Sequence, residues 1–269
     1  MNLKLQLSEH PNPITEDYPG RAETLGLHTG FSLYMTRQRK DDSLTKIEEI
    51  FSNIDSIGRE MAPDGDYELS ITGHSLGGAL ATILSFYAAS SNIFSRVKAI
   101  KVFTYAAPRV GCQRFLYAYQ HLEKIGKLRH ARFTNTRDFV PLVPFHGVTR
   151  SYKHVGMHIK LLGTDKIAQY WLRQALDVTY PRYHDGLSQL LRIWQVNVIR
   201  NINTPKGYKR NHTLTEYQRR IRFSIQYRSM LAQARKYHVV LSVNTRFLQS
   251  LIIFLTYLFL RGLNGRNEA

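Results

Sequence analysis

Cysteine is almost absent from this chain, since Cys112 is the only one among 269 residues. A single cysteine excludes a disulfide within the chain and favours a reducing compartment, or a protein that does not depend on such bridges. Residues 1–8 lack the long apolar core of a secretory signal peptide, so we expect a cytoplasmic protein. No zinc-ligand spacing or phosphate-binding glycine loop is present. We therefore expect neither a metal nor an organic cofactor.

Acidic residues are scarce relative to basic ones, giving a formal net charge of +17. Residues 182–269 hold 15 lysines and arginines but 3 acidic residues, whereas residues 1–181 hold 22 and 17. Such a basic segment suits an anionic membrane surface, or it forms the solvated face of long helices. Both interpretations stay open. Nucleic acid is the less favoured partner, because no RNA-binding signature accompanies the charge.

A long apolar run occurs at residues 239–260, and it contains Arg246. A membrane-spanning helix needs about 20 predominantly apolar residues, and a central arginine costs about 2.5–3.5 kcal/mol on insertion scales. The run is a helix packed on the main domain, an interfacial helix aided by the basic residues 219–236, or a true span. We predict that the C-terminal 50 residues associate with a membrane, so the cytoplasmic protein would be membrane-associated.

Glycine, in contrast, is concentrated between a strand-like and a helix-like run, in the sequence Gly73-His74-Ser75-Leu76-Gly77. A serine between two close glycines on a sharp strand-to-helix turn is held in a strained, exposed position. Both glycines lack Cβ and are expected to let the strand and the helix approach closely. We predict that Ser75 is a nucleophile for acyl transfer and that the backbone N–H of Leu76 contributes to an oxyanion hole. The alternative is a glycine-rich turn that only packs a helix on a strand.

Strands and helices alternate along the chain. We expect helices at 43–61, 76–90 and 111–126, and strands at 67–72, 97–105, 128–134 and 152–162. This alternation implies an α/β fold with a mostly parallel sheet and helices on both faces. Farther on, residues 165–201 are expected to be helical, residues 204–207 to interrupt the helix, and a helix to resume after His212.

A serine hydroxyl needs a histidine to take its proton and a carboxylate to orient that histidine. In α/β hydrolases the acid follows the serine and the histidine follows the acid. Asp138 fits the acid, because it comes directly after an expected strand; the alternative is a turn-forming or Arg137-paired surface aspartate. For the base, His212 is favoured over His184, since it stands after a proline and glycine break at the expected start of a helix. Three other histidines are expected to be structural: His146, His154 and His158.

Six segments together resemble the class 3 lipases, the fungal-type triacylglycerol lipase family of α/β hydrolases: residues 27–31, 71–81, 102–111, 135–141, 152–156 and 211–217. The resemblance implies an α/β-hydrolase fold and a serine carboxylic-ester hydrolase acting on acylglycerols or related lipids. It implies that Ser75 is the nucleophile, Asp138 the acid and His212 the base, with His184 as the alternative base. Ala106 stands where the family usually has glycine.

One departure from the family concerns a segment such as Phe-Arg-Gly-Thr, which ends a strand and supplies the second oxyanion-hole N–H. Residues 1–27 contain nothing similar. We therefore expect residues 1–217 to form a hydrolase domain without its first strands, and residues 218–269 to form a basic helical extension. A lost oxyanion donor costs about 10²–10³ in turnover. This leaves a second hypothesis, a weak or inactive hydrolase fold that acts in membrane association or protein interaction.

Overall fold

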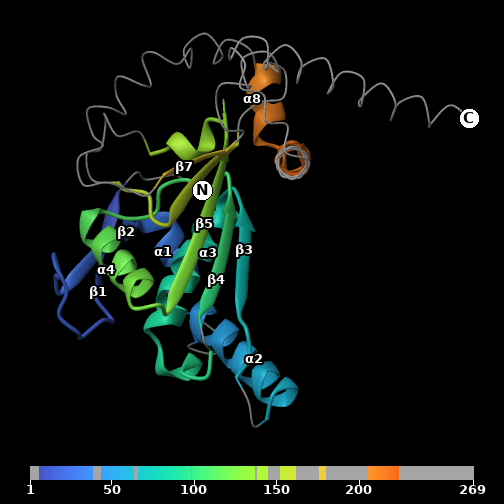
Figure 1. The fold of residues 1–269 in the computed structure, drawn as a ribbon. Coiled ribbons are helices and arrows are strands. Elements are labelled where there is room, and N and C mark those ends of the chain that lie inside the picture. Colours follow the sequence, from blue (N-terminus) through green and yellow to red (C-terminus); the bar gives the residue numbers. More distant parts are fainter. Residues whose placement is uncertain are drawn as a thin grey trace, which may run out of the picture.

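The structure, a computed structural model, describes residues 6–38, 44–63, 66–97, 99–136, 138–144, 152–161, 176–179 and 205–223. Its main sheet contains β3 (Ser70–His74), β4 (Ile100–Tyr105), β5 (Leu128–Asn135), β6 (Met157–Leu161) and β7 (Leu176–Thr179), in that spatial order (Figure 1). Strands β3 to β6 are parallel, and β7 is antiparallel to β6. The expected mostly parallel sheet is confirmed. A separate antiparallel pair consists of β1 (Leu7–Pro11) and β2 (Thr24–His28).

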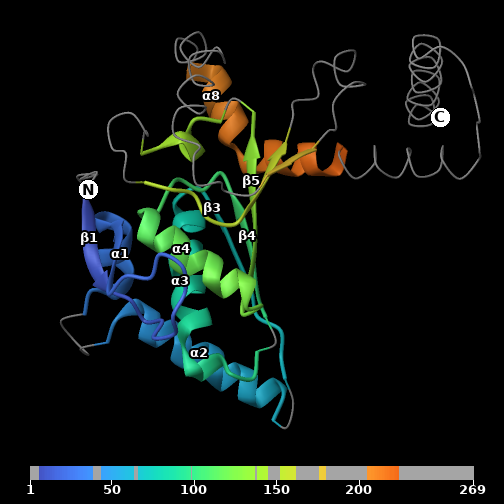
Figure 2. The ribbon, with the colours of Figure 1, turned by 60° about the vertical axis from the view of Figure 1, so that its left-hand side comes forward.

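Helices cover both faces of the main sheet. On one face lie α1 (Thr29–Thr36), α2 (Lys46–Met61), α3 (Leu76–Ser90) and α4 (Gln113–Lys124), as Figure 2 shows. The other face carries a smaller apolar cluster, in which Tyr217 and Ile221 of the helical residues 214–223 pack on Tyr105 and Phe133. The predicted coverage of both faces is therefore confirmed, although the second layer lies mainly over one end of the sheet.

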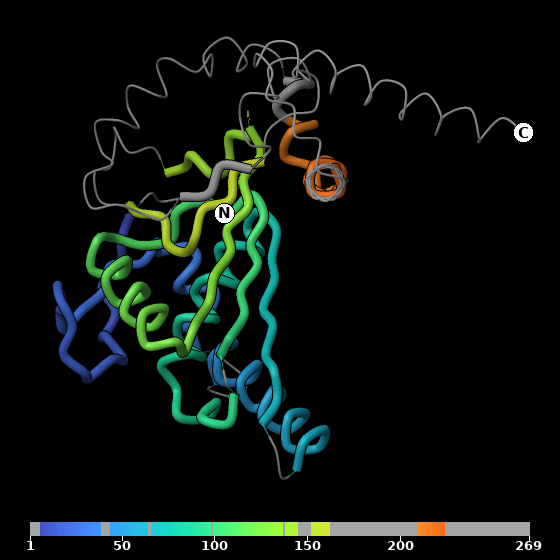
Figure 3. Tube along the Cα trace, in the orientation of Figure 1, coloured from blue at the N-terminus to red at the C-terminus, as the bar shows by residue number. Residues whose placement is uncertain are grey.

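That end is where the carboxyl ends of the parallel strands meet. In Figure 3 the trace of β3, β4 and β5 runs toward the segment that ends at residue 223. Ligands in open α/β sheets bind outside the carboxyl ends of strands. Ser75 follows β3 and Asp138 follows β5, so the fold brings both to this end.

Two predicted elements beyond residue 164 are wrong. Residues 176–179 form strand β7 and not part of a helix, because Val178 and Thr179 are β-branched and Pro181 follows closely. Residues 205–207, expected to be a break, are helical, because α8 (Pro205–His212) begins there and proline is well suited to the first helical position. His212 consequently lies at the end of α8, before the helical residues 214–223.

Among the described residues, no helix is long and apolar enough to cross a membrane. The apolar run at 239–260, most of the basic extension 218–269, and the alternative base His184 lie outside the described residues.

Candidate active site

Ser75 occupies a sharp turn between β3 and α3. It has φ +56° and ψ −123°, and its N–H donates to the carbonyl of Tyr105 over 2.9 Å. A positive φ in a non-glycine residue costs on the order of 1–3 kcal/mol and persists only where the surroundings enforce it. Leu76 is the first residue of α3. Its N–H therefore belongs to the helix-terminal amides that lack an intrahelical acceptor and favour negative charge.

The close approach of strand and helix depends on Gly73, and the expectation that Gly77 shares this role is wrong. A Cβ on Gly73 would lie 2.2 Å from the carbonyl oxygen of Gly77, whereas a Cβ on Gly77 would meet nothing within 4 Å. Gly78 is the second tight position, because its Cβ would lie 2.8 Å from the Cβ of Ala107. The reason is orientation: Gly73 faces the backbone of Gly77, Gly78 faces Ala107, and Gly77 faces open space.

The two glycines of the motif should therefore respond differently to alanine. Gly73→Ala forces backbone apart and should destabilise the protein by at least about 2 kcal/mol. Gly77→Ala adds a methyl group in open space within a helix and should stabilise it by up to about 1 kcal/mol. Urea unfolding of both variants measures the difference. Equal stability of the two variants would contradict the assignment of the close approach to Gly73.

Ser75, His212 and Asp138 form a continuous series of hydrogen bonds. The Nε2 of His212 lies 2.9 Å from the Oγ of Ser75. The Nδ1 of His212 lies 3.1 Å from Oδ1 and 3.2 Å from Oδ2 of Asp138. A carboxylate only accepts, so Nδ1 carries the hydrogen and Nε2 of the neutral ring is free to accept the serine proton. The structure thus brings together the three residues expected from the sequence.

Asp138 is held in place by Val140, two residues along the chain, and by the distant Tyr217. Its side chain is 0% exposed, Oδ1 accepts the N–H of Val140 over 3.0 Å, and Oδ2 accepts the hydroxyl of Tyr217 over 2.7 Å. Burial, and then the nearby Asp138 charge, raise the pKa of Tyr217 well above its ordinary value, so this hydroxyl remains a donor. The burial of Asp138 does not fit a surface aspartate.

A buried ion pair fixes the turn that carries His212. The Nε of Arg220 donates to Glu216 over 2.7 Å, and its Nη1 donates to the Oγ1 of Thr136 over 2.8 Å. Its Nη2 also donates to the Oδ1 of Asn211. Hydrogen bonds from Arg219 and Arg220 lower the pKa of Glu216 to about 2. One side chain thereby links the residue before His212 to the end of β5.

The other candidate residues lie in different surroundings. The Nε2 of His154 lies 2.7 Å from the carbonyl of Pro141, and that of His158 lies 2.6 Å from the Oγ1 of Thr134, in agreement with the expected structural roles. His146 and His184 lie outside the described residues. Ala106 is fully buried with φ +55°, which explains why glycine suits this position.

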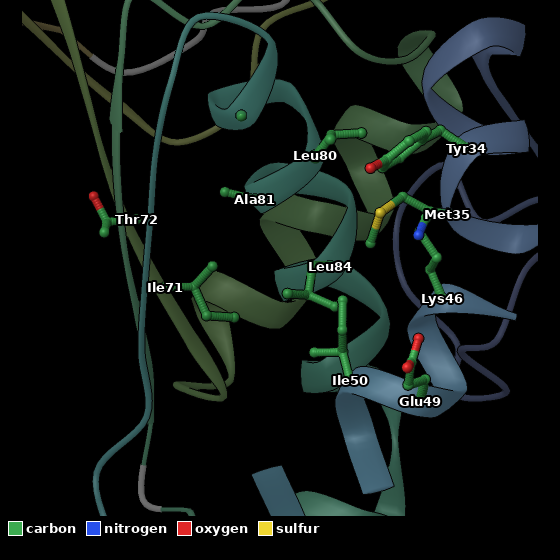
Figure 4. A pocket seen from close by; sticks show the side chains of 11 residues that line it. Tyr34, Met35, Lys46, Glu49, Ile50, Ile71, Thr72, Leu80, Ala81 and Leu84 are labelled. Atoms are coloured by element: carbon green, nitrogen blue, oxygen red, sulfur yellow. The ribbon is translucent and has the colours of Figure 1, made fainter. Parts of the chain in front are cut away.

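A cavity of about 360 Å³ lies on the side of β3 that faces α3, and Gly77 is the residue nearest to Ser75 in the sequence among those that line it. It lies between β3, α1, α2 and α3, reaches Gly77, and is lined mostly by apolar side chains such as Met35, Ile50, Leu80 and Leu84 (Figure 4). Strand β3 is the edge of the sheet within the described residues. The expected lack of a strand that supplies a second oxyanion donor stays a prediction.

The family model described as lipase (class 3) matches residues 6–148. The chain belongs to the class 3 lipase family. The expected α/β-hydrolase fold is thereby supported by family membership as well as by the parallel sheet and the serine turn.

The sequence matches to individual relatives cover part of this chain. Phospholipase A1-Igamma2, chloroplastic, of Arabidopsis thaliana is 32% identical over 166 residues, covering 54% of this chain and 30% of that protein. Phospholipase A1-IIgamma of the same plant is 34% identical over 146 residues, covering 51% and 33%. The match thus spans about a third of the length of each plant protein. Lipase II from Rhizopus niveus superposes with a TM-score of 0.46 at 21% identity, covering 68% of this chain and 57% of that one.

Proposed function

We propose that this class 3 lipase-family protein hydrolyses a carboxylic ester of a lipid through an acyl-enzyme formed on Ser75. The observation that carries the proposal is the hydrogen-bonded series from Ser75 through His212 to the buried Asp138. Nucleophile, base and orienting acid stand within hydrogen-bond reach of one another, which is the arrangement that activates a serine at neutral pH.

In the proposed reaction the Oγ of Ser75 attacks the ester carbonyl carbon as its proton passes to Nε2 of His212. The negative charge that develops on the carbonyl oxygen is stabilised by the N–H of Leu76 at the start of α3. His212 then gives its proton to the leaving alcohol, and the acyl-enzyme forms. A water molecule, deprotonated by His212, attacks the acyl carbon, and the carboxylic acid leaves as Ser75 regains its proton.

Asp138 orients His212 and stabilises the imidazolium that forms twice in each cycle. Its two hydrogen bonds, from Val140 and Tyr217, hold the carboxylate in place without neutralising it. A buried carboxylate needs such donors, because an unpaired buried charge is costly.

The expected substrates are acylglycerols or related lipids. Support comes from the family, from relatives named phospholipase A1, and from the mostly apolar cavity that reaches Gly77, two residues after Ser75. Two large apolar side chains next to the reacting residues are exposed, Leu76 at 50% and Leu214 at 46%. Exposed Lys209, Arg210 and Arg222 lie within eight residues of Leu214 in the sequence, which suits a lipid surface with negative charge.

A fluorophosphonate probe tests this function, because it reacts with serines activated by a neighbouring base. We expect labelling of Ser75 in the folded protein, confirmed by mass spectrometry of the labelled peptide. Ser75→Ala should abolish the labelling, and Ser70→Ala, at the exposed start of β3, should not. Absence of labelling in a folded sample would contradict the proposal and favour a weak or inactive hydrolase fold.

A further inference from the structure

We propose that His74 is a positioning residue that holds the main chain of His212; this inference rests on the proposed function. His74 is the last residue of β3 and directly precedes Ser75. Its Nε2 lies 2.8 Å from the carbonyl oxygen of His212. The strand that bears the nucleophile is therefore bonded to the backbone of the base as well as to its ring.

The end of α8 explains why this bond matters. The last four carbonyls of a helix lack intrahelical partners, and α8 ends at His212. The carbonyl of Asn211 accepts a hydrogen bond of 2.9 Å from Nδ2 of Asn135, at the end of β5. The carbonyl of His212 accepts the ring N–H of His74, at the end of β3. Side chains at the ends of two strands thus donate hydrogen bonds to the last two carbonyls of α8 and hold the end of this helix over the sheet.

The ring of His74 also has a defined orientation. A carbonyl only accepts, so Nε2 of His74 must carry the hydrogen in this arrangement. The ring centroid lies 4.8 Å from that of His212 and 6.0 Å from that of Tyr217, which itself bonds Asp138. His74 therefore touches the base and the residue that steadies the acid.

Loss of the His74 donor should move His212 relative to Ser75, and a displacement of about 1 Å can cost about 10²-fold in rate. We expect His74→Ala to lower kcat by about this factor on a short-chain p-nitrophenyl ester, with KM unchanged. His74→Gln should restore most of kcat, because its amide nitrogen reaches the position of Nε2. His121→Gln, on α4 and bonded to Glu16, is the control and should match the wild type.

Two results would overturn the inference: full kcat in His74→Ala, or a His74→Gln variant as slow as His74→Ala. If His74→Ala does not fold, as judged by circular dichroism, His74→Phe supplies a ring without the donor and takes its place. Ser75→Ala is run beside these variants. Turnover that persists in Ser75→Ala refutes the proposed function itself, whereas its loss with an unaffected His74→Ala refutes only the positioning role.

Discussion

Alanine at His212 should abolish nearly all turnover, lowering kcat by about 10⁴–10⁶-fold, and alanine at Ser75 should cost about as much. Each residue depends on the other for catalysis. The Ser75 hydroxyl is a poor nucleophile unless Nε2 of His212, 2.9 Å away, accepts its proton. Because the residues act as a unit, the double variant should be no slower than either single variant. Initial rates on a p-nitrophenyl ester measure all three.

The Ser75→Ala variant also serves as the control that the loss of activity does not come from unfolding. Ser75→Ala removes one half-buried oxygen at the surface of the turn, so its urea unfolding midpoint should stay near that of the wild type. Asp138→Asn keeps the shape but favours the wrong tautomer of His212, and should lower kcat by about 10⁴-fold. If His212→Ala keeps most activity while His184→Ala loses it, the base has been assigned wrongly and His184 takes its place.

The serine turn and the acid were predictable because their signals are local. Gly73-His74-Ser75 lies between a β-rich run and a helix-forming run, and Asp138 comes just after β5. Both facts follow from neighbouring residues, and parallel strands bring the two ends together. The strand-to-helix alternation between residues 43 and 134 was equally readable, with α3 found at the predicted residues 76–90, whereas β1, β2 and α1 were not predicted.

The surroundings of the base were not predictable in the same way. The contacts of Tyr217 with Asp138, of Arg220 with Thr136 and of His74 with His212 join segments 79, 84 and 138 residues apart. No local pattern encodes such pairs. Pro205 misled the prediction because proline both ends helices and begins them, and only the fold decides which applies. Gly77 matched the motif without sharing the steric role of Gly73.

Acid should unfold this protein from about pH 6.5 downward, because three histidines are held in uncharged form: His130, which is buried, and His154 and His158, which are half-buried. Burial, and then the positive charge of Arg132, lower the pKa of His130 to about 3 and that of His158 to about 2. The same causes place the pKa of His154 well below its ordinary value. In the unfolded chain these rings take up protons near pH 6.5. Below that pH the unfolded state binds more protons, so stability is present above pH 6.5 and is lost as the pH falls.

The expected loss of stability is the sum of the contributions of these histidines, reduced by that of a carboxyl group that acts in the opposite direction. Each such histidine removes about 1.4 kcal/mol per pH unit. Burial raises the pKa of Glu123 to about 7, so this carboxyl acts in the opposite direction: its contribution is present at low pH and lost as the pH rises through 7. One carboxyl offsets one histidine, which leaves a net loss of about 5 kcal/mol between pH 6.5 and 4.5. A typical domain has about 5–15 kcal/mol in total.

Urea unfolding at several pH values measures this loss through the midpoint, with the slope m expected to stay constant. His158→Gln keeps a polar partner for Thr134, whose Oγ1 lies 2.6 Å from Nε2, but it cannot titrate. The variant should therefore lose about 1.4 kcal/mol less per pH unit than the wild type between pH 6.5 and 4.5. A flat stability profile in the wild type, or identical slopes in the two proteins, would show that these histidines are not held uncharged by burial.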